Sequence, residues 1–154
     1  MNLADMHAKS EKIAKPWMGD TLPPRITDTS MGPLDETGRS EAWNLTFDSP
    51  GGNASVTINT FRGMFTCYAP PGEAGRLPDL QPGFFRDGAR LYAIAKEMAG
   101  NLIAEGYTVS VGTAAAPETR HATWYLHFEK ADGKTAPRTI LVDANSGAVE
   151  QVLD

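Results

Sequence analysis

The chain has few of the residues that carry metal, disulfide or nucleophile chemistry. It contains one cysteine, Cys67, and three histidines among 154 residues, and a lone cysteine excludes an internal disulfide. His121 and His127 stand six residues apart on one expected strand, roughly 20 Å, which is too far for both to bind one metal ion. Cys67 lies in an apolar strand pattern with no basic neighbour to activate it, so we expect a buried structural thiol rather than the nucleophile of a hydrolase. These shortages predict no enzyme activity, no metal site and no cofactor.

Long apolar runs and an excess of positive charge are also missing. No run approaches the 18 residues that a transmembrane helix needs. The 14 basic and 19 acidic residues give a net charge of −5, which argues against nucleic acid as a partner. The first residues lack the basic start and apolar middle of a signal peptide. We therefore expect a cytoplasmic protein as the sequence stands, and a periplasmic or secreted one if a signal peptide has been removed.

What the sequence does contain is an internal similarity. Sliding the chain by 81 residues gives nine identities over residues 12–47, where unrelated segments would give roughly two or three. A shift of 84 places Val56 on Ile140 and Ile58 on Val142 in the strands that follow. The identical positions of the first copy are Ile13, Ala14, Lys15, Gly19, Thr27, Arg39, Trp43, Leu45 and Phe47.

Apolar periodicity and turn residues predict an α+β fold of two pseudo-repeated units, each a helix followed by three to four antiparallel strands. The units span residues 1–68 and 84–154, and a Pro/Gly-rich joint at 69–83 is either a connector or a binding loop. We expect the first helix at 4–15, with Pro16 starting a new turn, and the second at 85–105. The expected strands are 25–30, 41–48, 55–60, 65–68, 107–111, 121–130, 138–143 and 148–153.

The last hairpin of the second unit carries a family resemblance. It reads Ile-Leu-Val-Asp-Ala-Asn-Ser-Gly-Ala-Val over residues 140–149. An apolar strand, an Asp, a Ser/Thr-Gly turn and a further strand are typical of PepSY domains, which residues 85–154 resemble. The first unit matches only through its repeat partners. The resemblance implies a non-catalytic module that inhibits or chaperones a protein partner, and the tandem plan is similar to that of β-lactamase inhibitory proteins.

Two tryptophans invite a binding role, but their setting predicts otherwise. Trp43 and Trp124 alternate with Leu and Phe along their strands, so the three side chains of each strand point the same way, under the helix. We expect both indoles in the core.

The opposite face of the second unit is the candidate interface. It would present Tyr125, His127 and Leu141 where solvated polar residues are expected, a mixture typical of protein interfaces. Alternatively, the two units pack against each other through this face.

The leading hypothesis is a non-enzymatic protein-binding module of an inhibitor or immunity type, with an unidentified protein partner and a monomeric or weakly dimeric state. The alternative is a small-ligand carrier with a pocket between helices and sheet, although bulky inward side chains favour a filled core.

Overall fold

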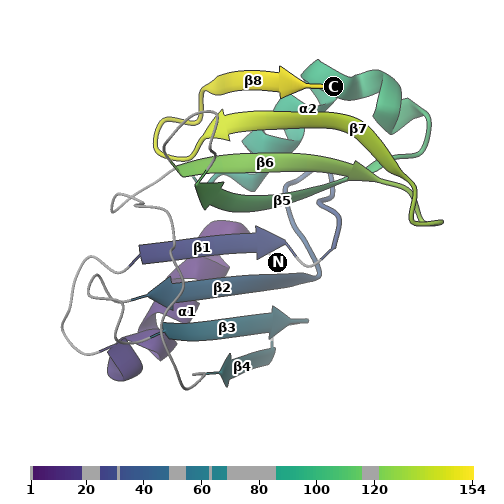
Figure 1. Ribbon diagram of the computed structural model, residues 1–154. Helices are drawn as coiled ribbons and strands as arrows, with labels where there is room; N and C mark the ends of the chain where they lie inside the picture. Colours follow the sequence, from purple (N-terminus) through teal and green to yellow (C-terminus); the bar gives the residue numbers. More distant parts are fainter. Residues whose placement is uncertain are drawn as a thin grey trace.

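The computed structural model describes residues 2–18, 25–30, 32–48, 55–62, 64–68, 86–115 and 122–154. They form one antiparallel sheet of eight strands, in the order β4-β3-β2-β1-β5-β6-β7-β8, with two helices (Figure 1). The α+β class with an antiparallel sheet is therefore confirmed. The elements are α1 (Leu3–Met18), β1 (Arg25–Ser30), β2 (Ala42–Asp48), β3 (Ser55–Phe61), β4 (Met64–Tyr68), α2 (Gly88–Ala104), β5 (Thr108–Ala115), β6 (Ala122–Glu129), β7 (Thr135–Asp143) and β8 (Val149–Leu153).

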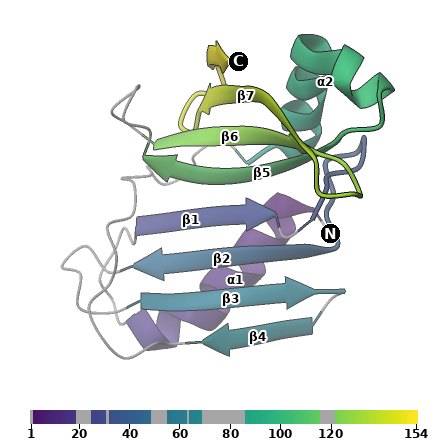
Figure 2. The same cartoon turned by 45° about the vertical axis from the view of Figure 1, so that its right-hand side comes forward.

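Both helices lie on the same face of the sheet, as the turned view shows (Figure 2). Helix α1 packs on β2, β3 and β4, whereas α2 packs on β5, β6 and β7. The sheet therefore has an inner face under the helices and an outer face away from them. Along each strand, successive side chains alternate between these faces.

The first helix runs further than expected. It continues through Pro16 to Met18, so the expectation that it ends at Lys15 is wrong. Proline removes one backbone donor, which would bond to the carbonyl of Lys12. Because helices in proteins are held mainly by the packing of their apolar face, one missing bond in the last turn does not end this one.

The two halves of the chain join into a single sheet through β1 and β5. Thr29 pairs with Gly112. Next to this pair, the Ser30 hydroxyl of β1 forms two hydrogen bonds with the backbone of Val111 in β5. It accepts a hydrogen bond from the Val111 amide at 2.9 Å and donates one to the Val111 carbonyl at 3.2 Å. The alternative in which the halves pack through the Tyr125 face is therefore wrong, since they meet edge to edge.

The strand pairing also corrects the second sequence shift. Leu45 pairs with Ile58 in the first half, and Leu126 pairs with Ile140 in the second. With Leu45 matched to Leu126, the pairing places Ile58 on Ile140 and not on Val142. The 84-residue shift is therefore wrong for these strands; it matched apolar alternation without the hydrogen-bond register.

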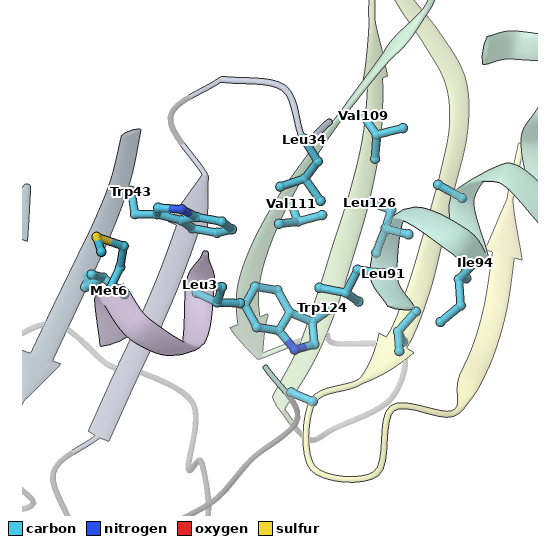
Figure 3. Close-up of a cluster of buried hydrophobic side chains, with 14 of the residues drawn as sticks. Leu3, Met6, Leu34, Trp43, Leu91, Ile94, Val109, Val111, Trp124 and Leu126 are labelled. Atoms are coloured by element: carbon cyan, nitrogen blue, oxygen red, sulfur yellow. The ribbon is translucent and has the colours of Figure 1, made fainter. Parts of the chain in front are cut away.

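The core runs under both halves without interruption. Trp43 and Trp124 are fully buried within it, which confirms their expected core role. Figure 3 shows Leu3, from the start of α1, pointing toward Trp124 of the other half. Because buried side chains from both halves form one cluster, we expect them to fold as one cooperative unit.

A second contact locks the halves together outside the core. The loop between β1 and β2 brings Gly38, with φ of +75°, against the first residues of α2. A Cβ atom on Gly38 would overlap the backbone of Gly88 and Ala89, and one on Gly88 would overlap the Gly38 carbonyl. Both positions therefore need glycine, for close approach at each and for positive φ at Gly38.

Candidate binding surface on the outer sheet face

The outer face of β5 and β6 carries aromatic side chains next to a shallow hollow. Burial alternates at the end of β6, where Leu126 and Phe128 are buried, Tyr125 is half-buried and His127 is exposed. The inward pair belongs to the core. Tyr125 and His127 therefore lie on the outer face of a strand whose inner face packs in the core.

The hollow is shallow, with a volume of about 360 Å³, and it lies at the seam between the two halves, where β1 pairs with β5. Gly112 is one of its lining residues, and its neighbours across the sheet are Thr29 of β1 on one side and Tyr125 of β6 on the other. A Cβ atom at position 112 would come within 3.3 Å of the Thr29 hydroxyl oxygen. The missing side chain therefore keeps the hollow open. Its lining residues are Thr29, Ser30, Ser110, Val111, Gly112, Thr113, Tyr125 and His127.

The two aromatic rings beside the hollow pack against each other. The ring centroids of Tyr125 and His127 are 5.9 Å apart, and their planes differ by 11°. Although His127 as a residue is exposed, enough of its imidazole is withdrawn from water that burial lowers its pKa below the usual 6.5. Burial therefore favours the neutral form of the imidazole.

Leu141 does not belong to the exposed surface. It lies on the outer face as predicted, paired with Tyr125 on one side and Gln151 on the other, but its exposed fraction is 0%. Thr123, the outward neighbour of Tyr125 along β6, is also fully buried. The expectation of an exposed Leu141 is therefore wrong, because alternation sets the face of a residue while the surrounding side chains set its exposure.

Of the eight lining residues, the sequence analysis named only Tyr125 and His127 and missed six, three of which show why. Gly112 carries a signal, since a glycine inside a strand pattern often marks a close backbone approach or a gap. Ser110 is an ordinary polar position of the same strand. Thr29 has no local signal at all, because only the pairing of β1 with β5 brings it beside Gly112.

A second hollow of about 350 Å³ lies beside the loop between β1 and β2. The Asp35 carboxylate in its wall accepts hydrogen bonds from the Thr37 hydroxyl at 2.6 Å, the Thr37 amide at 2.9 Å and the Arg39 amide at 3.0 Å. These bonds, that of the Thr37 side chain first, lower its pKa. The carboxylate is thus occupied in shaping the loop.

Metal and catalytic chemistry find little support in the described part of the chain. Within it, no three His, Cys, Asp or Glu side chains gather closely enough to hold a metal ion. His7 is buried against the ring of Phe47, 5.5 Å between centroids, in the other half of the molecule from His127. His121, the Cys67 thiol and the joint at 69–83 lie outside what the structure describes.

The space between helices and sheet is occupied by core side chains. The buried tryptophans, Phe47 and Phe128 fill it from the sheet side, and Leu91 and Ile94 fill it from α2. Both hollows described above are lined by strand and loop residues and lie open to the surface. The ligand-carrier alternative therefore gains no support from the described residues.

No helix among the described residues is both long and apolar enough to span a bilayer. Comparison of the chain with protein-family models, curated proteins and solved structures gave no match, to an enzyme family or to any other. The function therefore has to be inferred from the residues of the outer face.

Proposed function

We propose that this chain is a non-enzymatic protein-binding module that recognises its partner with the outer face of β5 and β6. The observation that carries the proposal is the stacked pair of Tyr125 and His127 beside the Gly112 hollow. The face lies opposite both helices (Figure 2), so a partner can approach it without disturbing the core.

The chemistry of the hollow resembles that of protein interfaces. Aromatic anchors in well-packed pockets supply most of the binding energy of such interfaces, and a polar rim surrounds them. Here Tyr125 stacks on His127, and a tyrosine side chain, with only two rotatable bonds, loses little entropy on binding. The hydroxyls of Thr29 and Ser110 flank the hollow. We expect an apolar side chain of the partner to enter it above Gly112.

The test is affinity capture from a lysate of the source organism, read by mass spectrometry. The immobilised proteins are the wild type, a Tyr125→Asp/His127→Asp variant, and a control with Ala93→Asp/Lys96→Asp on the exposed side of α2. The control also adds two carboxylates, but on the opposite face of the molecule. Leu141 is left unchanged, because a charge at a fully buried position would unfold the protein.

A partner retained by wild type and control but lost by the outer-face variant would support the proposal, once the pair has been reconstituted from purified proteins. A partner that binds the outer-face variant as well as the wild type would overturn it. Equal thermal stability of the three proteins is required before the comparison is made.

We also infer that the two halves derive from one duplicated unit. Support comes from the nine identities and from the order of elements, in which a helix and four strands are followed by a helix and four strands. The strand order, running outward from the β1–β5 seam to β4 and to β8, fits the same idea. The resemblance of the second half to PepSY domains, and an inhibitor or immunity role, stand as hypotheses within this proposal.

A further inference from the structure

The seam between β1 and β5 is the least paired line of the eight-stranded sheet. Every residue of β1 is paired with β2, and every residue of β5 is paired with β6. Between β1 and β5 themselves, the described residues form a single pair, Thr29 with Gly112. Both strands continue past this pair, β1 back to Arg25 and β5 on to Ala115, but without pairing to each other there. The seam therefore lacks most of the cross-strand contacts that stabilise a sheet.

The residues at the seam explain why it is weak on the outer face. Gly112 has no side chain to pack against Thr29 across the strands. Next to this pair, the Ser30 hydroxyl accepts from the Val111 amide at 2.9 Å and donates to the Val111 carbonyl at 3.2 Å. One side-chain hydroxyl thus supplies bonds across the seam beside an unpacked glycine.

The inner side of the seam is held more firmly. Leu3 of α1 points toward Trp124 in the shared core (Figure 3). The Leu34 amide, beyond the end of β1, donates to the Val109 carbonyl at 2.7 Å, and Gly38 lies against the first residues of α2. These contacts lie on the helix side of the sheet or past the end of β1, so the two strands can separate on the outer face while the core stays packed.

We infer that the β1–β5 seam opens locally on the outer face, with the core contacts as the hinge, and that the hollow is the entrance to this opening. The hollow is lined from both strands, by Thr29 and Ser30 of β1 and by residues 110–113 of β5. Separation of the strands therefore widens it directly. Regions with few contacts open at a lower free energy than the whole fold. The opening lets a partner's side chain that is too large for the closed hollow enter it; this use rests on the function proposed above, whereas the opening itself does not.

Amide hydrogen exchange measures the opening without any partner. The Val111 amide points across the seam to Ser30. The amides of Ser110 and Gly112 point the other way, into the continuous pairing with β6, because backbone groups of successive residues in a strand face opposite neighbours. After correction for intrinsic rates, Val111 should exchange at least about tenfold faster than these two residues. Equal protection of all three amides would mean that the seam opens only with the rest of the sheet, and would overturn the inference.

A disulfide across the seam tests the motion directly. Opposed residues of antiparallel strands have Cα atoms about 4.5–5.5 Å apart, within the range of about 4.4–6.8 Å that a disulfide spans. In a Cys67→Ser background, the variant is Thr29→Cys/Gly112→Cys. Oxidation should slow the exchange of the Val111 amide at least about tenfold relative to the reduced form of the same protein. No slowing once the bridge has formed would contradict an opening at this seam.

A matched bridge on the other side of β5 is the control. Ser110 pairs with His127 of β6, so Ser110→Cys/His127→Cys in the same background joins two strands that are already paired along their length. Its oxidation should leave the exchange of the Val111 amide within about twofold of the reduced form, because it does not cross the seam. Equal slowing by the two bridges would show that Val111 exchanges by unfolding of the whole chain and would refute the local opening. These measurements stand or fall independently of the lysate capture, since neither uses a partner.

Discussion

The close approach of Gly38 to α2 allows a prediction in which two energetic effects can be separated. Gly38→Ala adds one methyl group at a buried position where φ is +75°. The methyl group brings backbone strain, because an L-residue is disfavoured at positive φ. It also overlaps the backbone of Gly88 and Ala89, which cannot rotate away as a flexible side chain would.

The expected magnitudes follow from the two effects. Left-handed backbone costs about 1 kcal/mol for a residue with a Cβ atom, and overpacking costs about 1–3 kcal/mol when the neighbour must shift. Since the neighbour here is main chain, we take the upper end. Gly38→Ala should then lower the free energy of unfolding by about 4 kcal/mol and the Tm by on the order of 10 °C.

Substitutions at Gly133 and Gly88 separate the backbone strain from the steric overlap. Gly133 has φ of +82° with nothing within 4 Å of its virtual Cβ atom, so Gly133→Ala should cost only the strain, about 1 kcal/mol. Gly88 shows the overlap without positive φ, so Gly88→Ala should cost about 3 kcal/mol. Urea unfolding followed by tryptophan fluorescence would rank the three variants. If Gly38→Ala loses no more stability than Gly133→Ala, the interlocking of the loop with α2 is refuted.

Further predictions concern the hollow, the core and the histidine beside the hollow. Gly112→Val should fill the hollow and reduce partner binding at least tenfold while secondary structure by circular dichroism is kept; undiminished binding would show that the partner does not enter the hollow. Trp124→Ala should destabilise the fold by about 3–5 kcal/mol in urea unfolding, because it empties a fully buried site; cooperative unfolding near the wild-type midpoint would contradict its core role. His127 has a pKa below 6.5 in the folded chain, so the unfolded chain takes up its proton first and stability should fall as the pH drops below about 6.5. His127→Gln should remove that part of the pH dependence in melting curves between pH 5 and 7.5, and an unchanged dependence would mean that other groups cause it. Binding should weaken over the same acid range, since the partner would then meet a charged imidazole.

The candidate binding surface was harder to predict than the fold, because it lies at the seam where β1 pairs with β5. The helices and strands could be predicted from local sequence patterns, because apolar residues at helical spacing or in alternation indicate each element and its buried face. Trp124 with Leu126 and Phe128 is an example, and all three are buried. The ends of elements were less predictable: α1 passes through Pro16, and β5 extends to Ala115, because packing and strand pairing outweigh local preferences at element ends.

The sequence by itself determined the α+β class, the inward tryptophans, and the outer-face placement of Tyr125 and His127, because these follow from periodicity within single elements. Only the tertiary structure decided that the two halves share one sheet through β1 and β5, which brings Thr29 beside Gly112 and opens the hollow. It also decided that Leu141 is buried and that β4 and β8 form the two edges of the sheet. Each of these features depends on contacts between residues far apart in the chain, and no local pattern in the sequence records which distant strands will become neighbours.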